Sequence, residues 1–225
     1  ILPNATAKNN VRVMYNEKMK TKKKIIYKII KRMIDIIGAL IGTVLLIPVT
    51  IIIYFTRKFS KEEQGPLFYE QLRYGKNGKI FRLYKYRSMC IGADEKLKEY
   101  LANNEEARKE FKKTHKLQDD PRITQIGNFL RKTSLDELPQ MINILKGDMS
   151  FVGPRPVIEK EVEEYGENKE KFLSVKPGLT GYWQVNGRSN TTYEERMEME
   201  LYYVDNCSLW LDIKIFFKTF ITVFK

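Results

Sequence analysis

Side chains that bind soft metal ions or form disulfides are scarce in this chain of 225 residues. It has one histidine and two cysteines, Cys90 and Cys207, which lie far apart in the sequence. Zinc sites of the His and Cys type need several such ligands, and disulfide-stapled domains need more cysteine pairs. The sequence therefore excludes a zinc site of this type and a disulfide-stapled domain, and a reducing compartment is expected. Any metal ion must be a hard cation held by carboxylates and phosphates.

Acidic residues are also in the minority. The chain has 28 Asp and Glu against 40 Lys and Arg, which gives a formal net charge of +12. This excess predicts an anionic partner: nucleic acid, an anionic lipid surface or a phosphorylated substrate. A nucleic-acid-binding protein would carry its charge on one helix face or among exposed aromatic residues. Here the charge is densest beside an apolar segment, so nucleic acid is the less favoured partner.

The composition bounds the organisation of the chain. Hydrophobic residues make up 43% and charged residues 30%, which excludes a disordered chain. The mean hydropathy of −0.43 excludes a protein of many membrane helices but allows one. We expect a basic leader without regular structure over residues 1–24, a membrane segment over 25–58 and a catalytic or binding domain over 59–225.

The membrane segment contains 20 consecutive residues without a charge, 36–55. This length matches the ~20 residues that a helix needs to cross a bilayer. Lysines and arginines flank the run on both sides, and Pro48 in its middle removes a helical hydrogen bond. Both features favour a bent, re-entrant helix that enters the membrane and returns to the same face. A spanning helix stays open, because the positive charge is greater on the N-terminal side.

The remaining pattern predicts an α+β fold that is mostly helical. Residues 67–89 should form a small β-hairpin, because Asn77-Gly78 supplies the left-handed conformations of a tight turn. Its second strand would present Lys85 and Arg87 on one face, with cationic tips ~7 Å apart. The two prolines predict extended chain over 151–157. Helices are predicted over 94–116, 139–146, 157–172 and 192–206.

The last stretch, residues 209–225, is apolar around most of its circumference. Its polar residues form one narrow stripe: Lys214, Lys218, Thr222 and Lys225. Such a stripe is typical of an amphipathic interfacial helix on a membrane surface. A core helix with one wet edge fits the same pattern.

The segment from Arg131 to Gln140 is the richest in reactive side chains. Ser134 and Glu137 have the spacing of a capping box, so the acids could merely open a helix. In the functional interpretation, Asp136 and Glu137 lie at a helix N-terminus, where one carboxylate attacks while its neighbour holds a metal ion. Arg131 is close enough in sequence to bind phosphate oxygens.

Two further arginines are candidates for anion binding. Arg155 lies between Pro154 and Pro156, which restrict its backbone and could aim its guanidinium at an anion or a base edge. Arg188 follows a glycine-rich loop and could reach a phosphate, although that signal is weak alone. A surface arginine in a proline-rich loop is the alternative for Arg155.

Four motifs in one order make the chain recognisable. They are KRMIDIIGA (31–39), GPLFYEQLRYGKNGKIFRLYKYRSM (65–89), DPRITQIGNFLRKTSLDELPQMINILKGDMSFVGPRP (120–156) and KPGLTGYWQVNGR (176–188). Together they closely resemble the bacterial sugar transferase family, the monotopic polyprenyl-phosphate phosphoglycosyl transferases. Residues 1–24 match nothing in that family, and Cys207 stands where an aromatic residue is common.

The resemblance implies an activity and a location. Such enzymes use Mg²⁺ to move a sugar 1-phosphate from a UDP-sugar to a polyprenyl phosphate, with release of UMP. They work at the cytoplasmic face of the bacterial membrane, beside anionic lipid, in polysaccharide synthesis. The TGYWQVNGR segment looks more like members that use galactose or glucose. Whether the protein forms a homo-oligomer stays open.

The resemblance also implies roles for individual residues. Asp136 would be the nucleophile and Glu137 the metal ligand, while Arg131 would bind phosphate and Arg155 the nucleotide. The N-terminal helix of that family is re-entrant and breaks at a proline that matches Pro48, which strengthens the re-entrant interpretation. Ile47 stands here where the family often has serine before that proline.

Overall fold

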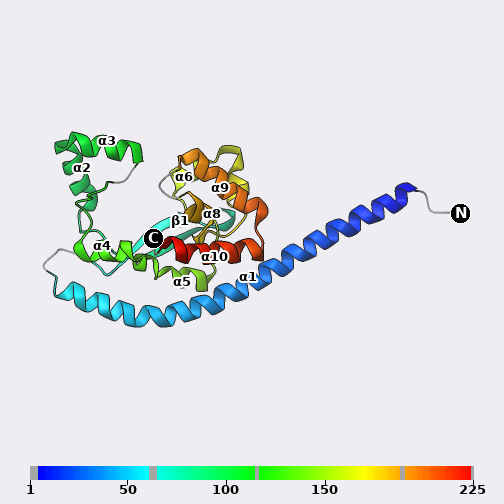
Figure 1. Cartoon of the computed structure of the whole chain (residues 1–225), viewed down its shortest axis with the longest axis horizontal. Coiled ribbons are helices and arrows are strands. Elements are labelled where there is room, and N and C mark those ends of the chain that lie inside the picture. The colour runs from blue at the N-terminus through cyan, green and yellow to red at the C-terminus, as the bar shows by residue number, and fades with distance from the viewer. Residues whose placement is uncertain (1–4, 61–64, 115–116, 188–190, 224–225) are drawn as a thin grey trace.

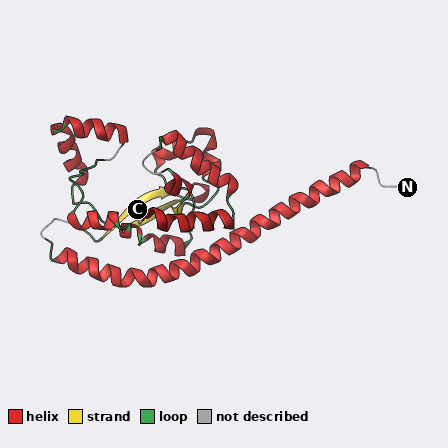
Figure 2. Ribbon diagram, viewed as in Figure 1, coloured by secondary structure: helices red, strands yellow, loops and turns green. Residues whose placement is uncertain are grey.

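The computed structural model describes residues 5–60, 65–114, 117–187 and 191–223. The described chain is mostly helical, with a small antiparallel hairpin, as the sequence predicts (Figure 2). The domain lies along the inner side of one very long N-terminal helix (Figure 1).

That helix, α1 (Ala5–Lys58), has 54 residues, which corresponds to ~80 Å at the usual helical rise. Its first part extends away from the rest of the protein (Figure 1). The prediction of a leader without regular structure is therefore wrong for residues 5–24, which continue the helix. Lys22–Lys58 is long and apolar enough to cross a membrane by length and composition.

The expected break at Pro48 is absent. α1 continues through Pro48 and follows a smooth arc instead (Figure 1). On its inner side, Leu46 and Ile53 are buried in one apolar cluster with Tyr86 and Leu130. Long helices curve around the core that they cover, with the convex side outward. Packing along the inner side therefore accompanies a gradual bend, and the long apolar helix fits a monotopic membrane helix.

The hairpin is confirmed. Strands β1 (Phe68–Tyr74) and β2 (Ile80–Tyr86) pair antiparallel, and the turn η1 (Lys76–Gly78) between them has Asn77 at φ 57° and Gly78 at φ 76°. Phe81 and Leu83 on β2 are buried against α1 and the middle of the chain. A parallel pair of short strands, β3 (Ser150–Val152) and β4 (Gly178–Thr180), was not predicted.

Short helices make up most of the rest. They are α2 (Ala93–Asn103), α3 (Glu105–Thr114), α4 (Gln125–Lys132), η2 (Leu135–Glu137), α5 (Gln140–Lys146), α6 (Glu159–Glu163), η3 (Gly166–Asn168), α7 (Lys169–Phe172), α8 (Tyr182–Asn186), α9 (Tyr193–Asn206) and α10 (Leu209–Val223).

Two predicted helices are divided in the structure. The first, over 94–116, becomes α2 and α3, because Asn104 is extended and its side chain accepts the Ala107 N–H at 3.0 Å, which starts a new helix. The second, over 157–172, is divided around Gly166, which has φ 50°. Residues 115–116, at the end of the first, lie outside the described chain. The helices predicted over 139–146 and 192–206 are confirmed as α5 and α9.

A buried amide joins α5 to the hairpin. Asn143 is fully buried, its side-chain oxygen accepts the Tyr84 N–H at 3.1 Å, and its amide nitrogen donates to the Arg82 carbonyl at 2.7 Å. Gly147 ends α5 in the left-handed conformation, at φ 86°, which is typical of a glycine just after a helix. These contacts set the position of β2 relative to the segment that precedes α5.

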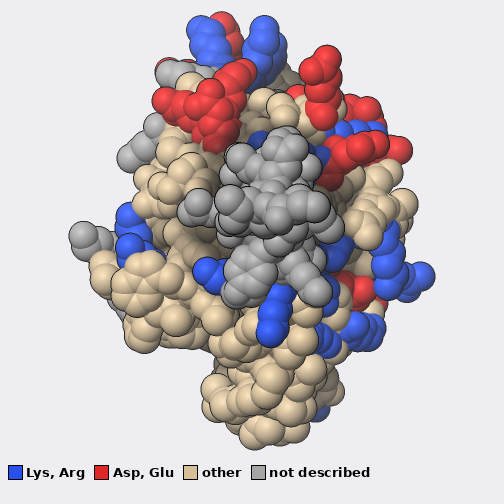
Figure 3. Space-filling view, turned by 90° about the vertical axis from the view of Figure 1, so that its right-hand side faces the viewer, with Lys and Arg blue, Asp and Glu red and all other residues tan. Residues whose placement is uncertain are grey.

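The C-terminal helix α10 combines both predicted alternatives. Ile215 and Asp212 are buried, while Trp210, Phe217 and Ile221 are each at least 60% exposed. Figure 3 shows a lower part of the molecule with few charged side chains, Lys and Arg above it, and Asp and Glu concentrated toward the opposite end, together with some Lys and Arg. This layering is typical of a protein that rests on a membrane surface.

Candidate active site

The two adjacent acids lie in η2, a single 3₁₀ turn between α4 and α5. Ser134 precedes the turn at φ 57° and its side chain makes no capping hydrogen bond. The capping-box interpretation is therefore wrong, and α5 begins only at Gln140, so the acids do not lie in its first turn. One short turn offers little helix dipole, and their ionisation depends on neighbouring charges instead.

Glu137 pairs with a lysine from the hairpin. The Lys85 ammonium lies 2.7 Å from Glu137 Oε1, and the two side chains are 25% and 32% exposed. The pair joins β2 to η2 across 52 positions of sequence. Lys85 thus lies at the acid pair, a contact that the sequence did not predict.

Asp136 is surrounded by opposing influences. Burial raises the pKa of its carboxyl and the negative charge of Glu137 raises it further, while Lys85 and Arg131 lower it; the net direction is upward. A raised pKa gives a more basic carboxylate, and the two cations favour its ionised form. Asp136 therefore has the properties of a group that reacts as a base or a nucleophile near neutral pH.

Arg131 lies in the last turn of α4, and a hydrogen bond to Ser88 positions its guanidinium. Its Nε donates to the Ser88 hydroxyl at 2.9 Å. Helix α4 approaches this part of the chain so closely that a Cβ at Gly127 would come within 1.9 Å of the Ser88 carbonyl oxygen. Ser88 was not singled out from the sequence, because its position just after β2 carries no motif of its own.

Arg87 does not join the acid pair. β2 ends at Tyr86, and the Arg87 Nε donates to the Pro66 carbonyl at 3.0 Å while its guanidinium lies 5.3 Å from the Tyr69 ring centre. Lys85 contacts Glu137, whereas Arg87 contacts Pro66 and Tyr69, so the two cations have different partners within the described chain. That their cationic tips lie ~7 Å apart stays a prediction. Arg188, the other predicted anion ligand, lies outside the described residues.

Arg155 belongs to a second cluster, which the sequence did not predict. Its backbone N–H donates to Glu200 at 3.1 Å, and its guanidinium lies 6.0 Å from the Trp183 ring centre. Arg196 lies 4.8 Å from the same ring. Among the described residues, the contacts of Arg155 do not include Asp136 or Glu137.

One partly buried and one fully buried carboxylate, Glu161 and Glu200, hold this arginine cluster together. Glu161 pairs with Arg73 at 3.4 Å and with Arg196 at 3.2 Å. Glu200 is 1% exposed and also accepts the Tyr165 hydroxyl. Within the described chain, the Arg73 Nε and the Arg196 Nη2 are buried without a hydrogen-bond acceptor. N–H groups without an acceptor can donate hydrogen bonds to an anion or to the polar edge of a ring.

Comparison with known proteins identifies the group that this chain resembles. The sequence model of the bacterial sugar transferases matches residues 26–225. The undecaprenyl-phosphate galactose phosphotransferase of Salmonella typhimurium is 47% identical over 192 residues, 85% of this chain and 40% of that protein. The exopolysaccharide production protein ExoY of Sinorhizobium fredii is 44% identical over 189 residues, 84% of this chain and 83% of that protein.

The UDP-glucose:undecaprenyl-phosphate glucose-1-phosphate transferase of Escherichia coli is 40% identical over 206 residues, 88% of this chain and 40% of that protein. The chain thus spans about 40% of the length of several of its curated relatives.

The acid pair gives a prediction about ionisation. Lys85→Met removes a cation that lowers the pKa of Asp136, so that pKa should rise further. Asp136 should then become protonated at a higher pH as the solution is acidified. Infrared titration of protein with isotope-labelled aspartate measures the midpoint. Lys79→Met is the matched control, because Lys79 is also on the hairpin but pairs with Asp148 at 3.4 Å. An unchanged midpoint in Lys85→Met would show that Lys85 does not act on Asp136.

Proposed function

Because this chain belongs to the bacterial sugar transferase family, we propose that it transfers a sugar 1-phosphate from a UDP-sugar to a polyprenyl phosphate such as undecaprenyl phosphate. The products are a polyprenyl diphosphate sugar and UMP, and the reaction begins the membrane stage of polysaccharide synthesis. The relatives are named for galactose and glucose transfer, which supports a hexose donor. The observation that carries the proposal is the Asp136–Glu137 pair between the cations of Lys85 and Arg131.

The reaction proceeds in two displacements. A carboxylate oxygen of Asp136 attacks the sugar-bearing phosphorus, the bond from that phosphorus to the bridging oxygen breaks, and UMP leaves with that oxygen. A phosphate oxygen of the polyprenyl phosphate then attacks the same phosphorus and displaces the Asp136 carboxylate. Lys85 and Arg131 offset the negative charge that develops on the phosphates. The raised pKa of Asp136 supports its role, because a more basic carboxylate is a better nucleophile.

Magnesium is part of the proposal. In phosphoryl-transfer sites Mg²⁺ is held by one or two carboxylates together with substrate phosphates. No group of three or more His, Cys, Asp or Glu in the described residues could hold a metal ion, so the adjacent carboxylates fit only an ion that the donor helps to bind. Glu137 would be the protein ligand, and the bound ion would neutralise the diphosphate.

The arginine cluster is proposed as the nucleotide site. Orphaned guanidinium N–H groups and the face of Trp183 suit a uridine base or its phosphates. Arg155 would donate to the nucleotide, while Arg73 and Arg196 supply positive charge behind it. The hydrogen bond from the Arg155 backbone to buried Glu200 keeps this loop in place.

The helix α1 is proposed to lie in the membrane from the cytoplasmic side, with both ends on that face. The basic flanks of its apolar run and its continuous arc around the domain support this arrangement. Anionic lipid headgroups would lie beside the Lys and Arg layer above the apolar base.

Asp136→Asn keeps the shape of the side chain but removes its negative charge, so turnover should fall by on the order of 10³-fold or more. Mass spectrometry of the unsubstituted protein with UDP-sugar, without lipid acceptor, should show a phosphosugar on the peptide that contains Asp136. The adduct should disappear when polyprenyl phosphate is added.

The activity of Glu137→Gln should recover partly at high Mg²⁺ concentration. Asp148→Asn serves as a control that retains activity. Rapid UMP release without an adduct would favour direct attack by the lipid phosphate; no UMP release at all would favour a non-catalytic membrane scaffold.

Arg155→Lys should raise the KM for the UDP-sugar by about tenfold or more, because one ammonium cannot replace a forked guanidinium. The KM for the polyprenyl phosphate should stay unchanged. Steady-state UMP release at varied donor and acceptor concentrations separates the two. Normal donor dependence in the variant would remove Arg155 from the nucleotide site.

Thiol labelling tests the proposed topology. With Cys90 and Cys207 replaced, single cysteines at Asn16 and Ser60 should both be protected from a membrane-impermeant reagent in intact cells. Both should react after the cells are permeabilised. Reaction of either cysteine from outside would mean that α1 spans the membrane.

A further inference from the structure

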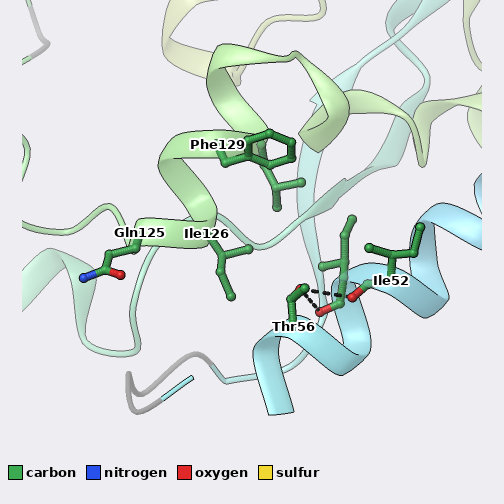
Figure 4. Close-up of a pocket in the computed structure, with 7 residues that line it drawn as sticks. Ile52, Thr56, Gln125, Ile126 and Phe129 are labelled. Carbon is green, nitrogen blue, oxygen red and sulfur yellow. Dashed lines mark hydrogen bonds between the residues drawn. The ribbon is translucent and has the colours of Figure 1, made fainter. Parts of the chain in front are cut away.

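A groove between the end of α1 and the helix α4 is not used by the chemistry described above. It has a volume of ≈ 330 Å³ and is lined by Ile52, Ile53, Thr56, Gln125, Ile126, Phe129 and Leu130. Figure 4 shows apolar side chains of the two helices facing one another across it. A volume near the lower end of the ~300–1,000 Å³ range of ligand pockets suits one narrow chain.

The groove is lined mainly by apolar side chains, with Thr56 and Gln125 as its two polar residues. Ile53 and Leu130 on its floor are 5% and 1% exposed, while Ile52 and Phe129 on its rim are 62% and 59% exposed. The Thr56 hydroxyl donates back to the helix at the Ile52 carbonyl, 3.0 Å away, so this hydroxyl is satisfied without a ligand. An exposed apolar hollow of this kind marks a binding surface for an apolar partner.

The floor of the groove and the turn that carries the acid pair share one apolar cluster. Leu130 on the floor is followed directly by Arg131, which lies close enough to lower the pKa of Asp136. Leu135, which precedes Asp136, packs in the same apolar cluster as Leu130 and Ile53. The groove floor and the base of the reactive turn are therefore one packed unit, apolar on one side and cationic on the other.

The other side of the groove is continuous with the membrane-facing surface of α1. Ile52 belongs to the row of exposed apolar residues that includes Ile47, Ile51 and Phe55. An apolar chain can therefore pass from the lipid into the groove without crossing water. A ligand that fits both ends carries one anionic head and a long apolar tail.

We propose that this groove binds the first isoprene units of the acceptor's polyprenyl chain and so directs its phosphate toward Arg131 and Asp136. The proposal rests on the proposed function and adds a site for the acceptor to it. A polyprenyl phosphate carries one linear chain of methyl-branched isoprene units, which matches one narrow apolar groove beside a cation, whereas a two-chain phospholipid does not. The groove would thereby position the attacking phosphate for the second displacement.

A bulky rim residue should obstruct the chain. Ile52→Trp should raise the KM for undecaprenyl phosphate by about tenfold or more. The phosphosugar adduct, which forms without acceptor, should form at the normal rate and to the normal extent. Ile41→Trp is the matched control, because Ile41 is 61% exposed on the same helix but away from the groove. An equal change in both variants, or none in Ile52→Trp, would overturn the proposal while leaving the proposed function intact.

Photochemical labelling tests occupancy without turnover. Undecaprenyl phosphate with a diazirine in its first isoprene units should label peptides that contain Ile52 or Phe129 in the unsubstituted protein. Unlabelled undecaprenyl phosphate should suppress this labelling, and Ile52→Trp should reduce it. Labelling elsewhere, or labelling of the groove by a diazirine phospholipid that undecaprenyl phosphate does not displace, would assign the groove to bulk lipid. Because this readout needs no catalysis, it separates failure of the acceptor site from failure of the proposed function.

Discussion

A helix with twenty successive uncharged residues cannot lie fully in water, and the rest of this protein is arranged around that constraint. The inner side of α1 is buried by the domain, through Ala39, Leu46 and Ile53, and the outer side keeps its isoleucines and leucines exposed. The domain therefore removes only one side of the apolar helix surface from water. The other half requires lipid, which fixes the side of the molecule from which a lipid substrate can approach.

Polar contacts set where the domain sits along α1. Just before the apolar run, the Asp35 carboxylate accepts the Ser150 hydroxyl and the Phe151 N–H, each at 3.0 Å. One turn earlier, the Lys31 ammonium lies 2.7 Å from buried Asp212 on α10. Hydrogen bonds are directional, whereas apolar contacts slide easily, so these bonds fix the register. The strand β3 and the helix α10 are thus held at the N-terminal end of the membrane segment.

The sequence predicted what depends on local pattern and missed what depends on distant partners. Asn77-Gly78 determines its own turn, so the hairpin was predicted correctly. The helix α5 was also predicted, but its buried residues are Gln140, Met141, Asn143 and Ile144, because its contacts with the hairpin and α1 decide which residues are covered. The prediction of a break at Pro48 was wrong, because the inner side of α1 packs around the core along its length. The separate partners of Lys85 and Arg87, Glu137 and the Pro66 carbonyl, were not predicted, because both partners come from other segments of the chain. The sequence could not predict the cluster of Arg73, Arg155 and Arg196, because these residues come from segments far apart in sequence and share no motif.

The reactive turn shows why the acid pair needed the whole fold. A carboxylate nucleophile must be basic enough to attack and yet ionised near neutral pH, and these demands oppose each other. Burial of the turn, to which the packing of Leu135 contributes, raises the pKa of Asp136 and so makes its carboxylate more basic. Lys85 from the hairpin and Arg131 from α4 favour the ionised form of the same carboxylate. Leu46 and Ile53 of α1 pack in the same cluster as Leu130 and Leu135. The packing of α1 on the domain and the burial of the turn that carries Asp136 therefore depend on one set of contacts.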